Sequence, residues 1–134
     1  EARVVAAAAA AERVEELKAE GNAVFREMRY SDAVQIYTQA LSLDPQNAVL
    51  YSNRSGALTA LAAYEQALAD AERCAALRPE WPKAHARRAA ALHGLHRFLP
   101  AVAAYARALA LDPRDRVLMA ARRQTSFAVA IEDN

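Results

Sequence analysis

The sequence predicts an all-α protein in which three tandem helix-turn-helix units form a solenoid that ends in a C-terminal capping helix. Three observations support this prediction. Alanine dominates a chain that has only three glycines, and alanine is the strongest helix former. The sequence repeats itself at a fixed interval, with a period of about 34 residues. Each period divides into two segments with the apolar periodicity of helices, as is typical of helical repeat proteins.

The period is visible when the sequence is shifted by one repeat against itself. Four sets of residues then share a position: Pro45, Pro79 and Pro113; Leu43, Leu77 and Leu111; Ala33, Ala67 and Ala101; Tyr30, Tyr64 and Phe98. Proline lacks a backbone N–H and disfavours the α conformation in the residue before it. The three prolines therefore mark the end of the second helix in each unit.

The apolar periodicity places the expected helices in order along the chain. The first helices of the three units span residues 14–28, 48–62 and 82–96, and the second helices span residues 31–43, 65–77 and 99–111. The corresponding units are 14–47, 48–81 and 82–114. Residues 1–13 are expected to form an N-terminal helical extension, and residues 115–134 a capping helix and tail.

Polar residues at the expected helix starts suggest N-caps. Ser31 and Asp32 are expected to cap the second helix of the first unit, and Asn47 the first helix of the second unit. The last helix has apolar residues available to cover the third unit, namely Val117, Leu118, Phe127 and Ile131. A solenoid needs such a cap because its end repeat otherwise exposes an apolar face.

Small residues recur where the helices of a unit must pack closely. One set lies on the first helices (Gly21, Ser55 and Ala89) and another on the second helices (Ala40, Cys74 and Ala108). A single cysteine excludes a disulfide framework and is compatible with the cytosol. Cys74 is therefore expected to be a small buried apolar residue without a redox role.

Charge and motif content exclude several functional classes. Lys and Arg total 17 against 16 Asp and Glu, so a general nucleic-acid binder is not expected. No apolar run approaches the roughly 20 residues that span a bilayer, so membrane insertion is not expected. His93 and His96 lie one turn apart, but no carboxylate or cysteine at suitable spacing completes a metal site. No phosphate-binding glycine loop, metalloprotease motif or nucleophile elbow occurs. We therefore expect no enzymatic activity, no cofactor and no metal.

The period, the small residues and the terminal proline together resemble the tetratricopeptide repeat family over residues 14–113. The resemblance implies a right-handed solenoid whose first helices line a concave groove. Polar residues lie on that predicted inner face: Lys18, Asn22, Asn53, Lys83 and Arg87. Residues four apart on a helix share a face, so three cations and two amides are expected to converge on one groove.

The strings around these residues are similar to the carboxylate-clamp subfamily, especially the first such domain of the heat-shock organising (stress-inducible) co-chaperones. They read LKAEGN at 17–22, YSNRS at 51–55 and WPKAHAR at 81–87. The resemblance implies that the five residues form a carboxylate clamp. Its ligand would be the acidic Glu-Glu-Val-Asp tail at the C-terminus of cytosolic 70-kDa or 90-kDa heat-shock chaperones. A cytoplasmic co-chaperone domain that binds this peptide as a monomer is therefore expected.

Further residues at groove positions are expected to tune selectivity: Phe25, Arg26, Gly56, Thr59, Ala60, Ala90, His93 and Gly94. The small residues Gly56, Ala60 and Gly94 either leave a pocket for an upstream aliphatic side chain or pack against neighbouring helices. One alternative function stays open. The domain is then a scaffold or self-association module that binds partners through its convex face or its terminal helices.

Overall fold

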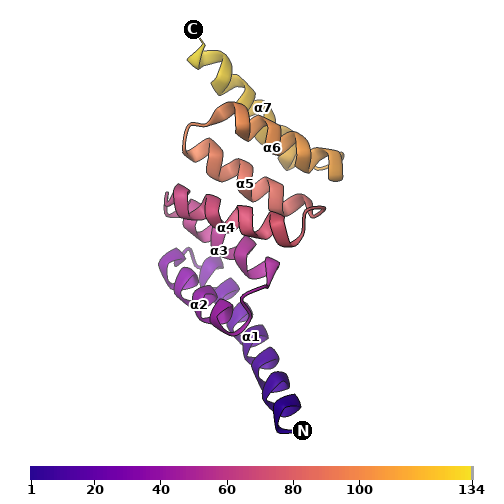
Figure 1. Ribbon diagram of the computed structural model, residues 1–134. Helices are drawn as coiled ribbons and strands as arrows, with labels where there is room; N and C mark the ends of the chain where they lie inside the picture. The colour runs from indigo at the N-terminus through magenta and orange to yellow at the C-terminus, as the bar shows by residue number, and fades with distance from the viewer. Residues whose placement is uncertain (134) are drawn as a thin grey trace.

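The computed structural model describes residues 1–133, and this part of the chain contains seven α-helices and no strand. The helices are α1 (Ala2–Arg26), α2 (Tyr30–Leu43), α3 (Ala48–Ala60), α4 (Tyr64–Leu77), α5 (Pro82–Gly94), α6 (Phe98–Leu111) and α7 (Arg116–Glu132). They stack along one direction, with the two termini at opposite ends of the molecule (Figure 1). The predicted all-α fold of repeated hairpins is confirmed.

Each helix packs against the next one in the chain, which gives the hairpins α1–α2, α3–α4 and α5–α6 and the final pair α6–α7. In addition, α3 contacts both α5 and α1. The first helices of the three hairpins are therefore neighbours and form one continuous layer. This layer brings together side chains that are distant in the sequence, such as Asn22 and Arg87.

The turn inside each hairpin uses a left-handed residue that is not glycine. Met28, Ala62 and His96 have φ values of 62°, 59° and 60°, and they share one position of the repeat. After each of them the next amide donates back to the preceding helix, as Ala63 N does to Leu58 O at 2.9 Å. This bond satisfies a carbonyl that the helix end would leave free.

The N-caps agree with the sequence only in part. Asn47 caps α3 as expected, because its side chain accepts a hydrogen bond from Leu50 N. The expectation for Ser31 and Asp32 is wrong: α2 begins earlier, at Tyr30, without a side-chain cap. The Asp32 carboxylate instead accepts a hydrogen bond from Arg29 Nε at 2.9 Å.

The predicted close-packing positions are fully buried. No solvent reaches Ala40, Cys74 or Ala108, and a larger side chain there would separate the helices. Burial raises the pKa of the Cys74 thiol to about 11. The thiol is therefore neutral at physiological pH and fills space as a small apolar group.

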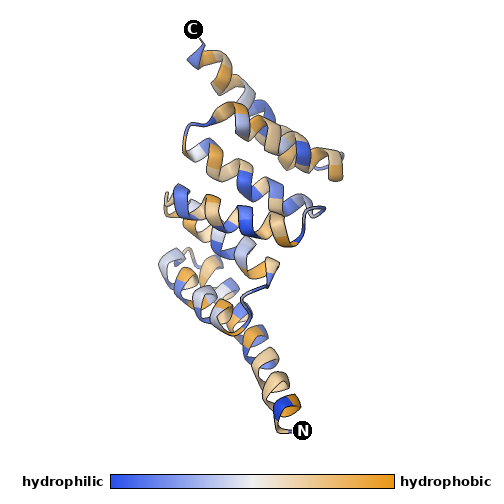
Figure 2. Cartoon of the chain, in the orientation of Figure 1, coloured by the Kyte–Doolittle hydropathy of each residue, from blue (hydrophilic) through white to orange (hydrophobic). Residues whose placement is uncertain are grey.

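The two end helices extend beyond the repeats. The expected N-terminal extension is continuous with the first repeat helix in α1, and its residues are largely exposed. In α7, Leu118 is buried against α6, but Val117, Phe127 and Ile131 are 77%, 68% and 59% exposed. The expectation that these three residues cover the last repeat is therefore wrong. Hydrophobic and hydrophilic residues are interspersed along the helices (Figure 2). No helix within residues 1–133 is long and apolar enough to cross a membrane.

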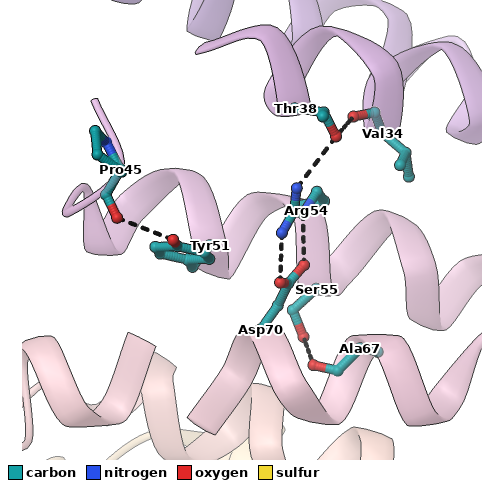
Figure 3. Close-up of polar contacts among 8 residues, drawn as sticks. All are labelled: Val34, Thr38, Pro45, Tyr51, Arg54, Ser55, Ala67 and Asp70. Carbon is teal, nitrogen blue, oxygen red and sulfur yellow. Dashed lines mark hydrogen bonds and ion pairs between the residues drawn. The ribbon is translucent and has the colours of Figure 1, made fainter. Parts of the chain in front are cut away.

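A polar cluster joins the first two hairpins on the face of the solenoid where α2 and α4 meet α3. Arg54 donates two hydrogen bonds to the Asp70 carboxylate, both 2.7 Å long, and a third to Thr38 Oγ1 at 3.2 Å. These contacts are drawn in Figure 3. The hydrogen bonds to Asp70 are the main cause that raises the pKa of Arg54. The ion pair lies within the α3–α4 hairpin, and the hydrogen bond to Thr38 joins this hairpin to α2.

Candidate functional site

Four of the five predicted clamp residues line one cavity of about 240 Å³ in the layer of first helices. Helix α1 provides Asn22, helix α3 provides Asn53, and helix α5 provides Lys83 and Arg87. The remaining lining residues are Phe25, Arg26 and Tyr37. Among the described residues, no carboxylate lines this cavity. Its polar surface consists of cations, amides and a phenol.

The two asparagines form a hydrogen-bonded unit with a tyrosine that the sequence did not single out. The Tyr37 hydroxyl donates to Asn22 Oδ1 at 2.5 Å, and Asn53 Nδ2 donates to the same oxygen at 3.2 Å. The unit joins α1, α2 and α3. Tyr37 lies on a second helix, at a position whose apolar neighbours mark it as core. Sequence reasoning therefore assigns it to packing alone.

Arg87 is the most desolvated cation in the cavity. Its Nε donates to Ser52 Oγ at 3.3 Å. Burial is the main cause that lowers the pKa of its guanidinium, which nevertheless stays charged because arginine does not lose its proton in proteins. Within residues 1–133, neither Arg87 nor Lys83 forms an ion pair with a carboxylate. The cavity therefore holds uncompensated positive charge.

Gly56 makes room for this guanidinium. A Cβ atom at residue 56 would lie 2.9 Å from Arg87 Cζ, closer than van der Waals contact permits. Gly56 and Ser52 are one turn apart on α3, and together they form the surface on which the Arg87 side chain lies.

The fifth predicted residue, Lys18, does not line the cavity. It lies one turn before Asn22 on α1, and its Nζ forms an ion pair with Glu15 at 3.0 Å. Glu15 is exposed, so the pair is a surface ion pair of small energetic value.

Apart from Gly56 and His93, the predicted secondary positions divide into three groups. Phe25 and Arg26 line the cavity, beside the clamp residues. Gly94 abuts Tyr64 of α4, because a Cβ there would overlap the Tyr64 ring. This contact is packing between hairpins. The exposed Ala60 and the half-buried Thr59 and Ala90 lie outside the cavity.

His93 connects α5 to the final helix. Its Nδ1 lies 2.8 Å from Thr125 Oγ1, and its ring packs edge-on against Phe98 at 5.1 Å between centroids. Since Thr125 Oγ1 donates to Ala121 O, His93 is the donor in this pair. In the part of the chain that the structure describes, no group of three or more His, Cys, Asp or Glu residues is arranged to hold a metal ion.

Comparison with known proteins places this architecture in a family. No protein-family model matches the chain. The solved structure of the first TPR domain of the human RPAP3 protein superimposes with a TM-score of 0.87 at 33% sequence identity, over 90% of this chain and 95% of that domain. The chain belongs to the tetratricopeptide repeat (TPR) family.

Two further relatives of this TPR domain are informative. The first TPR domain of Spaghetti (RPAP3), solved bound to the HSP90 peptide SRMEEVD, has a TM-score of 0.84 at 33% identity and covers 89% of this chain and 94% of that one. The Hsp70-Hsp90 organizing protein of Triticum aestivum is 44% identical over 116 residues, which are 87% of this chain. The chain spans about a fifth of the length of the first curated relatives that it matches.

Proposed function

We propose that this TPR domain captures the acidic C-terminal Glu-Glu-Val-Asp tail of 70-kDa or 90-kDa heat-shock chaperones through a carboxylate clamp. The clamp consists of Lys18, Asn22, Asn53, Lys83 and Arg87. One observation carries the proposal. Arg87 holds a desolvated positive charge, and within residues 1–133 it has no ion-pair partner and no carboxylate lines its cavity.

The chemistry of the cavity fits a chain end. A terminal aspartate carries two carboxylates close to each other, and the cavity carries Lys83 and Arg87 on adjacent turns of α5. Hydrogen bonds to charged groups contribute roughly 1.5–3 kcal/mol each. The amides of Asn22 and Asn53 add donors without adding repulsion between cations. A neutral or cationic chain end would leave the arginine uncompensated.

Lys18 joins the clamp by exchanging partners. An exposed ion pair contributes about 0–1 kcal/mol, so the ligand carboxylate needs little free energy to displace Glu15 from Lys18. Lys18 and Asn22 lie one turn apart on the same face of α1, so a peptide bound at Asn22 would come within reach of the lysine side chain.

The relatives support the same ligand class. A TPR domain of 33% identity was solved with SRMEEVD bound, and the name of the wheat relative refers to both Hsp70 and Hsp90. The proposed role is binding without catalysis, since the cavity presents hydrogen-bond donors but no nucleophile paired with a base. The family resemblance implies a cytosolic chaperone as the ligand, so the proposal includes a cytoplasmic location. One groove binds one peptide without a second copy of the chain, so we also propose a monomeric domain.

Isothermal titration calorimetry with SRMEEVD as free acid and as C-terminal amide tests the proposal. Amidation removes one of the two anions, so we expect the amide to bind at least tenfold more weakly, which corresponds to the loss of about 1.4 kcal/mol. Equal affinity for the two peptides would refute the clamp. A second acidic peptide, changed only upstream of the shared last four residues, then identifies which chaperone tail is preferred.

A further inference from the structure

The hydrogen-bonded unit of Tyr37, Asn22 and Asn53 depends on a close approach of Tyr37 to α1. Tyr37 is 1% exposed, and its hydroxyl reaches Asn22 because Gly21 has no side chain in the way. A Cβ at residue 21 would lie 2.5 Å from Tyr37 Cε1. The glycine therefore lets the ring approach α1 closely, so that the hydroxyl reaches Asn22 at the cavity.

The two donors occupy one end of the Asn22 amide. A carboxamide oxygen has two lone pairs, and here Tyr37 Oη and Asn53 Nδ2 use both of them. The amide group is planar, so its nitrogen is turned away from these donors. Among the described residues, no acceptor is hydrogen-bonded to Asn22 Nδ2, and Asn22 lines the cavity. Its two N–H groups are thus available to a ligand.

We propose that the Tyr37 hydroxyl is a positioning group that locks the Asn22 amide with its nitrogen toward the cavity, and so sets selectivity for a terminal carboxylate over a neutral carboxamide. This inference rests on the proposed function. Tyr37 acts through Asn22 and needs no contact with the peptide.

The physical reason is that an asparagine side chain can present either a donor or an acceptor. In the locked orientation the Asn22 amide presents only its N–H donors to the cavity, which suits an anion. If the amide rotated by half a turn, its oxygen would face the ligand carboxylate and repel it, whereas it would accept a hydrogen bond from a carboxamide. Burial is the main cause that raises the pKa of the Tyr37 phenol, and Arg87 and Arg26 lower it to a smaller extent. The hydroxyl therefore remains a donor at neutral pH.

The chain offers a matched control at the same repeat position. Tyr105 of α6 corresponds to Tyr37 after two repeats, and it is also buried. It lies outside the lining of the cavity. The middle repeat has Ala71 at this position, so of the two tyrosines at this position only Tyr37 contacts a groove asparagine.

The test measures the dissociation constants of free-acid and amidated SRMEEVD for the wild type, Tyr37→Phe and Tyr105→Phe. Tyr37→Phe keeps the ring and removes only the hydroxyl. We expect it to bind the free acid about tenfold more weakly and the amide within twofold of wild type, so that discrimination between the peptides falls about tenfold. Tyr105→Phe should leave both constants unchanged.

A double-mutant cycle assigns the effect to Asn22. In an Asn22→Ala background, Tyr37→Phe should change free-acid binding by less than twofold, because the amide that it positions is absent. A tenfold effect in that background would overturn the inference, and so would a Tyr37→Phe variant that weakens both peptides equally. If the wild type binds the free-acid and amidated peptides equally, that result refutes the proposed clamp. It then also refutes this inference, which rests on the clamp.

A measurement on the wild type covers the case in which Tyr37→Phe does not fold. In ¹⁵N-labelled protein, the side-chain amide protons of Asn22 should shift strongly when the free-acid peptide is added and much less with the amide. Asn22 side-chain resonances that do not respond to the free acid at saturation would also overturn the inference.

Discussion

Lys83→Ala and Arg87→Ala separate the two cations that α5 presents one turn apart. Lys83 is exposed and without an ion pair in the described chain. Arg87 is half-buried and lies against α3. A charge-assisted bond in contact with water is weaker than one that is desolvated. The two substitutions should therefore differ in size although both remove one positive charge.

The expected magnitudes follow from the range for hydrogen bonds to charged groups. Lys83→Ala should cost about 1.5 kcal/mol of binding, or roughly tenfold in Kd. Arg87→Ala should cost about 3 kcal/mol, or more than one hundredfold. Stability should change by less than about 1 kcal/mol in either variant, because relief of an uncompensated charge at Arg87 offsets the hydrogen bond lost at Ser52.

Calorimetry at two salt concentrations and thermal unfolding followed by circular dichroism provide the measurements. Raising the salt concentration should weaken peptide binding by the wild type more steeply than binding by Lys83→Ala, because the variant has one fewer charge to screen. Arg107→Ala is the control, because Arg107 is an exposed residue of α6 outside the cavity. The reasoning is refuted if Lys83→Ala, while folded, binds the free-acid peptide as tightly as wild type at low salt. Equal losses for both variants would refute the difference assigned to burial.

Three further predictions concern stability. Ala62→Gly should stabilise the fold by about 0.5–1 kcal/mol in urea unfolding. The substitution removes the steric cost of a left-handed alanine, and the larger backbone entropy that glycine loses on folding offsets only part of this gain. An unchanged unfolding midpoint would contradict this prediction. Asp70→Asn should destabilise by about 2–3 kcal/mol, since it leaves Arg54 without its counter-charge, while peptide affinity stays within twofold. The raised pKa of Cys74 means that ionisation favours the unfolded chain above about pH 8.5. Between about pH 8 and 10.5 the free energy of unfolding of the wild type should therefore fall by about 2 kcal/mol more than that of Cys74→Ala. Parallel pH profiles of stability for the two proteins would exclude this explanation.

The fold could be predicted in detail because equivalent positions of successive repeats have the same packing environment. A residue such as Ala33 must be small in every repeat, and a proline such as Pro79 must follow a helix. These constraints are local and repeat along the chain. The left-handed turn residues could not be predicted, because Met28, Ala62 and His96 lack the glycine that usually marks such a turn.

The proposed clamp residues stand out because they are polar on a predicted inner face, and four of the five line one cavity. Tyr37 could not be assigned, since its role depends on a hydrogen bond between two helices. Phe127 and Ile131 show the opposite error. Their apolar character suggested burial, but the buried residues of α7 are Leu118, which packs on α6, and Thr125, which contacts His93 of α5.

The close approach of Arg87 to Gly56 sets binding against stability at one position of α3. Glycine inside a helix costs roughly 0.5–1 kcal/mol relative to alanine, so Gly56→Ala should make the free domain more stable. The same methyl group would displace the flexible guanidinium from its place on α3 and weaken the proposed clamp without altering any charge. A library of variants screened for thermal stability alone would therefore enrich alanine at residue 56 and select against peptide binding. The glycine is a stability defect that the domain retains in exchange for a correctly placed arginine.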